Sequence, residues 1–436
     1  MKDLQKKLKD INKEYNYFNV ICDDLQEQYK NANKKGKLYG MPISIKDCVC
    51  VKDVETRGGS KILEGYKPTF NATVVQRLID QGAIILGKTS QDEFGFGSFS
   101  THTYNIPKNP FDKTRSCGGS SGGSAGITRK LSDLKIKHVS IAESTGGSIA
   151  CPAAFCGVYG YTPTYGLFSR YGLLDYGNSL DKIGIMADNL KDIKTVFEVV
   201  KGYDEKDSTS LNLEKTPLNK DDSIKKVAII KETLNVDPEI KEAIIKTVKA
   251  KFGSYDEISL PIVEKYATPC YYIIAVSEAS TNLAKYCGLR YGAAEELKGT
   301  FDEYFTKVRT KYFEPESKRR IMLGTFTRMA GYRDAFYLKA AKVRTMIINE
   351  YKKAFQKYDL IISPTMPIVA PKFSDIEKLT PLQNYMMDIM TVGPNLAGLP
   401  HLSCNAGYSK KEKLPIGIMY IANHLNDYKL MNDKLK

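Results

Sequence analysis

The sequence predicts an α/β fold, in which short apolar strands alternate with amphipathic helices around a largely internal sheet. Apolar runs of strand length recur throughout the 436 residues, between stretches with helical spacing. Hydrophobic residues make up 42% of the chain, which is enough for a sizeable core. The length would allow two or three domains, but no internal repeat divides it. We therefore expect a single domain over residues 1–436.

The first predicted elements lie in the N-terminal half. A mostly apolar run at 41–45 predicts a strand, and an amphipathic stretch at 72–80 predicts a helix before a strand at 83–86. Residues 227–230 predict another strand. Asp237 and Pro238 then supply an N-cap and a first helical residue, which predict a helix to about residue 252.

The later elements complete the alternation. Residues 331–358 have the strongest helical pattern of the chain, within a helical, substrate-side region expected over about 263–357. Strands are predicted at 360–362 and 416–421. The polar segment 202–226 predicts a surface connection.

Composition limits the class of protein. The absence of any run of roughly 18 to 20 apolar residues, and the charged start at 1–8, predict a soluble cytoplasmic protein with no membrane segment. Nine scattered cysteines without a Cys-x-x-Cys pair predict buried free thiols, and neither a disulfide framework nor a metal site. The net charge of +14 fits a polyanionic partner such as tRNA, but the lysines are spread along the chain, so a lysine-rich composition explains it nearly as well.

Two serine-bearing glycine segments, 118–124 and 144–148, place Ser120 and Ser148 28 residues apart. Glycines beside a serine let the backbone turn sharply and bring its amides close to a reacting carbonyl. A serine hydroxyl also needs a base. Lys46 follows an apolar run that can carry it inward, where burial disfavours the ammonium form. Together these are the parts of a serine hydrolase that uses lysine as its base.

Other interpretations of these segments stay open on the residues alone. Gly-Ser runs are more often structural turns, and most lysines are exposed. Residues 118–122 and 122–126 also fit the G-x-S-x-G elbow of Ser-His-Asp hydrolases, but that elbow needs an apolar strand before it, and 112–117 is polar. We therefore expect no role in the chemistry for the four histidines, which are His102, His138, His401 and His424.

Six segments of the sequence resemble the amidase signature family. They are 42–47, 118–124, 145–157, 319–326, 342–345 and 395–400. The last three narrow the resemblance to the A subunits of tRNA-dependent amidotransferases, and the similarity runs from about Tyr39 to about Ile421. It implies the amidase signature fold, a central mixed sheet covered by helices on both faces, with the signature core at about 40–200.

The resemblance also implies a Ser-Ser-Lys triad. Ser148 would be the nucleophile, Ser120 the relay, held by a cis peptide after Gly119, and Lys46 the base. The oxyanion would bind to backbone amides of the second loop, which are those of Thr145, Gly146, Gly147 and Ser148.

The sequence departs from the family pattern around these loops. Ser144 stands where the family has Asp, and Ala150 where it has Arg. Because losing both partners of a buried charge pair can be nearly neutral, their joint absence is compatible with activity. Cys117 replaces a proline, and the spacing between the two serines is several residues longer than in the family. These changes concern the geometry of the loops and leave the triad intact.

The late segments imply glutamine as the substrate. Arg320 would bind its α-carboxylate as a planar fork, Asp388 would bind its α-ammonium group, and Tyr271 would line the pocket. The chain would hydrolyse glutamine to glutamate and ammonia without a cofactor, since it has no G-x-x-x-x-G-K-[ST] loop. By resemblance, a separate B subunit would use ATP and Mg²⁺ to amidate Glu-tRNA(Gln), Asp-tRNA(Asn) or both and would hold the tRNA, with a small C subunit bracing the two.

Two other classes of function remain. A free-standing amidase for small acyl or aryl amides would share the triad without needing Arg320 and Asp388. An inactive scaffold would keep only a partner surface, and the intact Lys46, Ser120 and Ser148 argue against it.

Overall fold

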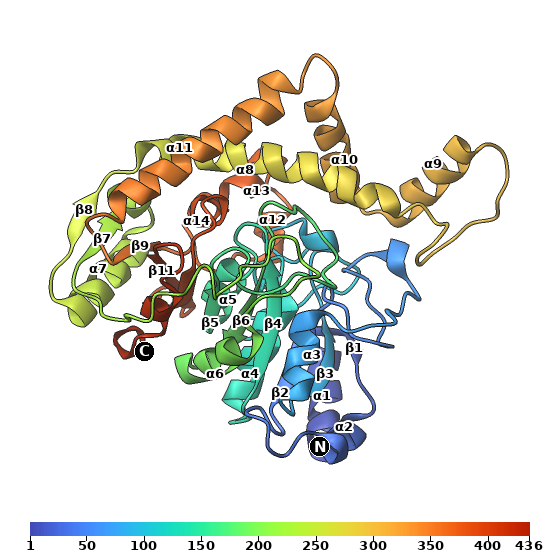
Figure 1. Cartoon of the computed structure of the whole chain (residues 1–436), viewed down its shortest axis with the longest axis horizontal. Coiled ribbons are helices and arrows are strands. Elements are labelled where there is room, and N and C mark those ends of the chain that lie inside the picture. Colours follow the sequence, from blue (N-terminus) through green and yellow to red (C-terminus); the bar gives the residue numbers. More distant parts are fainter.

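The computed structural model describes residues 1–436 and is built on one eleven-stranded sheet (Figure 1). In spatial order its strands are β1 (Phe18–Ile21), β3 (Ile84–Thr89), β2 (Pro42–Lys46), β4 (Val139–Ser144), β6 (Lys182–Ala187), β5 (Tyr159–Thr162), β10 (His401–Tyr408), β11 (Pro415–Ala422), β9 (Leu360–Pro364), β7 (Val227–Ile230) and β8 (Asp256–Ile258). β2 pairs in parallel with β3 and β4, and β7 with β9 and β8. All pairs from β4 across to β9 are antiparallel, so the sheet is mixed, as predicted.

Helices cover both faces of this sheet, which confirms the predicted fold class. One face carries α3 (Thr73–Asp80), α6 (Leu190–Val200) and α7 (Pro238–Phe252). The other carries α1 (Lys2–Tyr15), α4 (Gly122–Asp133) and α5 (Ala150–Cys156) over the N-terminal strands, and α8 (Pro261–Asn282), α11 (Lys339–Ala354) and α14 (Val392–Leu396) over the C-terminal ones. The remaining helices are α2 (Leu25–Asn31), α9 (Phe301–Tyr312), α10 (Pro315–Arg328), α12 (Phe373–Ile376) and α13 (Pro381–Met386).

Most predicted elements lie where the pattern placed them. β7 has the predicted bounds. α7 begins at Pro238, and the Asp237 side chain accepts a hydrogen bond from the backbone amide of Glu239. The single helix predicted over 331–358 is wrong at both ends. A π-helical turn at Asp334–Leu338 precedes α11, which runs only from Lys339 to Ala354. No residue of that turn is buried, so its apolar side chains have no core against which a regular helix would be held.

The alternation of side chains along β2 directs Lys46 to one face of the sheet. Ile43 and Ile45 join the core beneath α3 and α6. Ser44 and Lys46 therefore point to the opposite face, which α4 and α5 cover. The strand thus delivers a charged side chain into the interior at its end.

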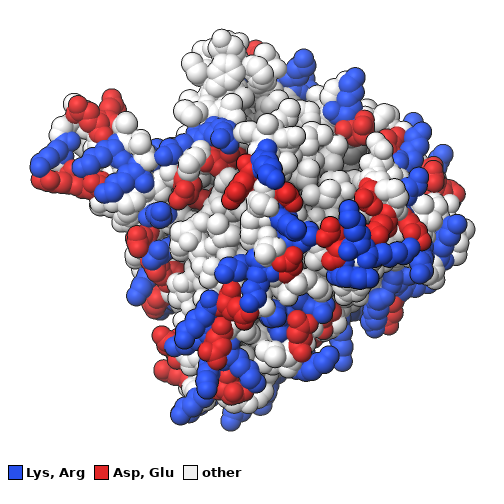
Figure 2. Space-filling view, turned by 180° about the vertical axis from the view of Figure 1, so that it is seen from behind, with Lys and Arg blue, Asp and Glu red and all other residues white.

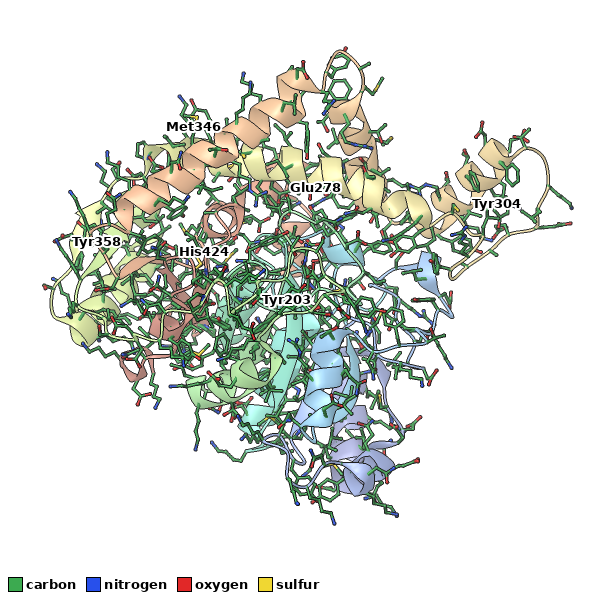
Figure 3. All side chains as sticks on the ribbon, viewed as in Figure 1. Tyr203, Glu278, Tyr304, Met346, Tyr358 and His424 are labelled. Carbon is green, nitrogen blue, oxygen red and sulfur yellow. The ribbon has the colours of Figure 1, made fainter.

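α8, α10 and α11 form a layer of helices along one side of the molecule, and α9 projects beyond it (Figure 1). Glu278 on α8 accepts a hydrogen bond from the Ser179 amide at 2.9 Å, which ties this layer to the loop before β6 (Figure 3). Tyr304 lies within the projection, where its hydroxyl donates to the Gly288 carbonyl at 2.8 Å (Figure 3).

The surface is charged but without a single basic patch on the face in Figure 2, where Lys and Arg are interspersed with Asp and Glu. None of the helices combines the length and the apolar character that a membrane crossing requires. All nine cysteines are free thiols, and all are buried except the half-buried Cys287, which confirms that prediction for eight of them.

Candidate active site

Lys46, Ser120 and Glu143 meet in a buried cluster. Lys46 Nζ lies 2.8 Å from Ser120 Oγ, 2.8 Å from Glu143 Oε2 and 3.0 Å from the Glu143 carbonyl oxygen. The Lys46 side chain is 0% exposed and that of Glu143 4%. Two of the three predicted triad residues are therefore in direct contact, together with a carboxylate that the sequence did not indicate.

The backbone before α4 fixes the position of Ser120. The Gly119–Ser120 peptide is cis, as the resemblance implied. A Cβ on Gly119 would lie 2.6 Å from the Phe99 amide nitrogen and 2.7 Å from that of Ser100, so only glycine fits there. Ser120 Oγ makes no hydrogen bond except the one to Lys46. Its hydroxyl proton is therefore not committed to another acceptor.

Ser148 lies in the loop between β4 and α5 and is 7% exposed. The amides of Thr145, Gly146, Gly147 and Ser148 in this loop donate to no acceptor within the protein. Four consecutive free amides fit an oxyanion site, because buried backbone donors are otherwise nearly always paired. Ser148 Oγ has no hydrogen bond to Ser120 or Lys46, so the contacts join the lysine to the relay serine but not to the proposed nucleophile.

Polar contacts hold this loop, in which Ser144 and Ala150 stand where the resemblance implies an Asp and an Arg. Ser144 Oγ donates to the Gly146 carbonyl at 2.9 Å, and Thr145 Oγ1 donates to Glu143 Oε1 at 2.8 Å. The amide of Asn395 donates to the Thr145 carbonyl. Ala150 is buried. The loop is thus tied down by neutral hydrogen bonds and by Glu143 instead of a charge pair at 144 and 150.

Arg320 on α10 lies in a buried aromatic pocket. Its Nε donates to Glu316 Oε1 at 2.8 Å and its Nη1 to the Tyr176 hydroxyl at 2.7 Å, which leaves Nη2 without a partner. The guanidinium also lies 5.3 Å from the ring centres of Phe96, Tyr272 and Tyr385. One edge of the cation is therefore available to an anion.

Asp388 and Tyr271 complete the link between this pocket and the Ser148 loop. The Asp388 carboxyl accepts hydrogen bonds from Ser98 Oγ at 3.0 Å and from the Tyr272 hydroxyl at 2.6 Å, and burial raises its pKa. A Cβ on Gly146 would lie 2.8 Å from Tyr271 Cζ. The predicted pocket residues and the predicted oxyanion loop therefore pack against each other.

A cavity of about 40 Å³ lies beside Arg320. It shares His102, Arg319, Pro381 and Asn384 with an open cavity of about 630 Å³ that α12 and α13 help to form. The two cavities therefore adjoin, and the smaller one borders Arg320.

No histidine bonds to Ser120 or Ser148. His138 is buried beside Ser44 Oγ at 3.1 Å, and burial lowers its pKa to about 3. Burial also lowers the pKa of His401 well below its usual range. No histidine therefore contacts either serine, and the assignment of lysine as the base stays a prediction.

Four residues of the site were not predicted: Glu143, Ser98, Tyr176 and Tyr272. Glu143 left one signal, because it is the only charged residue in the strand 139–144. The other three lie outside any motif, and only the fold brings them to Arg320 and Asp388.

Comparison with known proteins places this geometry in a family. The family model described as "Amidase" matches residues 1–431. The A subunit of the glutamyl-tRNA(Gln) amidotransferase of Archaeoglobus fulgidus is 44% identical over 424 residues, 96% of this chain and 90% of that protein. That of Sulfolobus acidocaldarius is 42% identical over 423 residues, 94% of this chain and 87% of that protein.

A solved structure agrees with these sequences. The crystal structure of the A subunit of glutamyl-tRNA(Gln) amidotransferase from Thermotoga maritima superposes with a TM-score of 0.79 at 32% identity, over 96% of this chain and 86% of that one. The chain therefore belongs to the amidase family, in which the two relatives at 44% and 42% identity are amidotransferase A subunits.

Proposed function

We propose that this protein is the glutaminase subunit of a tRNA-dependent amidotransferase, and that it acts through a Ser-Ser-Lys triad within one domain. The observation that carries the proposal is the fully buried Lys46 held 2.8 Å from Ser120 Oγ. The relatives named as amidotransferase A subunits support the choice of glutamine. One continuous sheet with strands from Phe18 to Ala422 supports the single domain.

Catalysis begins with the nucleophile. Ser148 attacks the side-chain amide carbon of glutamine, and its proton passes through Ser120 to Lys46. The amides of Thr145, Gly146, Gly147 and Ser148 stabilise the oxyanion. The relay then returns the proton to the leaving nitrogen, and ammonia departs. Water finally hydrolyses the glutamyl ester to glutamate by the same path.

Substrate recognition uses the two charged ends of glutamine. Arg320 binds the α-carboxylate through its free Nη2, and the buried aromatic rings around it keep that ion pair dry. Asp388 binds the α-ammonium group, and Tyr271 lines the wall beside Gly146. Glutamine enters through the larger cavity, past Arg319 and Asn384.

The ammonia is used by a partner. We assign activation with ATP and Mg²⁺, and most contact with aminoacyl-tRNA, to a separate B subunit, with a small C subunit bracing the pair in the cytoplasm. An exposed apolar patch of this chain supports such an assembly. It covers the end of α10 and the connection to α11, where Met322 is 66% exposed, and it comprises Met322, Leu323, Phe326, Met329 and Tyr332. Figure 2 shows largely uncharged atoms over this end of the molecule.

Ser148→Ala tests the proposal. We expect it to abolish glutamine hydrolysis, while the assembled complex still forms amidated tRNA from added ammonium, because only ammonia production needs the nucleophile. The measurement is amidated tRNA formed with glutamine and with ammonium. Near-normal glutaminase, or failure of ammonium to rescue the complex, would contradict the assignment.

A further inference from the structure

Glu143 contributes two of the three acceptors around Lys46 Nζ. Its carbonyl and its carboxylate lie 3.0 and 2.8 Å from the nitrogen, and Ser120 Oγ is the third neighbour at 2.8 Å. Neither a carbonyl nor a carboxylate oxygen can donate, so only Ser120 can send a proton toward the nitrogen. Glu143 therefore occupies two of the three hydrogen-bonding directions of Lys46 Nζ, and the third direction points at Ser120 Oγ.

The Glu143 side chain is itself fixed from the other side. Thr145 Oγ1 donates to its Oε1 at 2.8 Å, while Oε2 contacts Lys46. A Cβ on Gly95 would lie 3.5 Å from Ser120 Oγ and 3.6 Å from Glu143 Oε2, so the two oxygens border one small space. The carboxylate is part of the same buried cluster as the relay and is not a distant counter-ion.

Charge balance identifies the counter-ion of Lys46. An isolated ion with no exposed surface is costly, whereas an ammonium and a carboxylate in contact form a pair of zero net charge. Asp181, Cys48 and Tyr176 are further titratable groups near the pair. Burial and the neighbouring Glu143 charge raise the pKa of Asp181 well above its usual range, and burial raises that of Cys48. Glu143 is therefore the carboxylate paired with Lys46.

We infer that Glu143 is the terminal proton acceptor of the relay, a positioning residue that acts through Lys46; the inference rests on the proposed function. As the Ser148 oxygen bonds to the amide carbon, Lys46 releases one proton to Glu143 Oε2, which frees the lone pair of Nζ. In the same step the Ser120 proton moves to Lys46 Nζ and the Ser148 proton moves to Ser120. The pair gains one positive charge while the substrate gains one negative charge. When the carbon–nitrogen bond breaks, the proton returns along the same chain to the leaving nitrogen.

This order of proton transfers removes a difficulty of a lysine base that acts alone. Such a lysine must be neutral before each turnover, whereas the paired lysine begins as an ammonium and remains one after the transfer. The proton acceptor is then the Glu143 carboxylate, whose Oε2 lies 2.8 Å from Lys46 Nζ.

Glu143→Gln is the decisive variant, because the amide keeps the shape and can still accept from Lys46 and Thr145. We expect kcat for glutamine hydrolysis to fall by about 10²- to 10⁴-fold, the usual range for loss of a proton acceptor, with little change in KM. The residual rate should rise with pH, because the lone lysine must then lose a proton before it can accept one. Glu143→Asp keeps a carboxylate and should recover part of the loss.

Controls separate this inference from the proposed function and from misfolding. Glu93→Gln changes another buried glutamate, which is bound by Ser60 and Ser317, and should keep near-normal kcat. Ammonium-dependent amidation by the complex should persist in Glu143→Gln, Glu143→Asp and Glu93→Gln. If Glu143→Gln keeps near-normal kcat across the pH range, or loses only affinity, Glu143 is not the acceptor. If Ser148→Ala also keeps its glutaminase, the triad itself is wrong.

Discussion

Two buried lysines on neighbouring strands differ in the groups that surround their side-chain nitrogens. Lys46 ends β2, and Lys88 lies beside it on β3, with Ile45 opposite Lys88 in the parallel register. Neither is exposed. Lys88 Nζ contacts the carbonyls of Asp47 and Val49 and the hydroxyl of Thr56, at 3.2, 2.6 and 2.8 Å. Each lysine thus has three close acceptors, two of them unable to donate.

The hydroxyl acceptor distinguishes the two lysines, because it is Thr56 beside Lys88 and Ser120 beside Lys46. The Thr56 hydroxyl donates to the Val54 carbonyl at 3.1 Å, so its proton is already used and it can only accept from Lys88. Ser120 has no such second acceptor. The Asp47 carboxylate lies 3.8 Å from Lys88, whereas Glu143 is in hydrogen-bond contact with Lys46. Burial alone therefore does not distinguish the two lysines; a hydroxyl with an uncommitted proton and a carboxylate in hydrogen-bond contact do.

The largest effect expected from this comparison is at Lys46. Lys46→Arg keeps the charge but cannot give up a proton in this pH range, so glutaminase kcat should fall by about 10²- to 10⁴-fold. Lys88→Met is the matched control: it removes the donor from three buried acceptors and should lower the unfolding midpoint while kcat per folded molecule changes little. Glutaminase assays and thermal unfolding of both variants measure this. An active Lys46→Arg enzyme would remove lysine from the mechanism.

A third buried cation, Arg320, sharpens the comparison, because one of its nitrogens has no partner in the protein. Arg320→Ala should weaken glutamine use, as kcat/KM, by about 2 to 4 kcal/mol, with hydrolysis of a small amide lacking a carboxylate hardly changed. Lysine there should substitute only in part, because it cannot form the planar fork. Asp388→Asn should likewise affect glutamine more than an analogue without the α-amine. Equal losses on charged and uncharged amides would assign these residues to folding and leave the free-standing amidase as the better description.

The smallest effect concerns a fourth buried cation, Lys182, which has only the Leu399 carbonyl as a partner, at 2.9 Å. Burial lowers its pKa to about 7, below the value of roughly 10.4 in an unfolded chain. Between these values the unfolded state binds more protons, so this residue makes the free energy of unfolding rise with pH. Lys182→Met should remove that rise. Denaturant unfolding at pH 7 and pH 9 measures it, and an equal pH slope in both proteins would show that Lys182 is charged in the folded state.

The sequence predicted those parts of the fold and site that depend on local pattern. β7 and α7 follow from an apolar run and from the Asp237–Pro238 start, and the Lys46–Ser120 contact joins residues within recognisable motifs. Whether Ser148 completes the triad stays a prediction. Glu143 was missed because its significance depends on where the end of β2 falls, a property of strand register and not of its own segment. Tyr176 and Tyr272 reach Arg320 from segments far apart in the chain, which no local pattern records.

The order of strands has a consequence for biosynthesis. β1 to β6, from residues 18–187, form one half of the sheet, and β7 to β9, from 227–364, form the other. Only the hairpin of β10 and β11, residues 401–422, joins them, through β5 and β9. Until the ribosome has released that hairpin, the nascent chain carries every triad residue but exposes two unpaired strand edges, which favour aggregation. Its solubility during synthesis thus depends on the last strands to emerge.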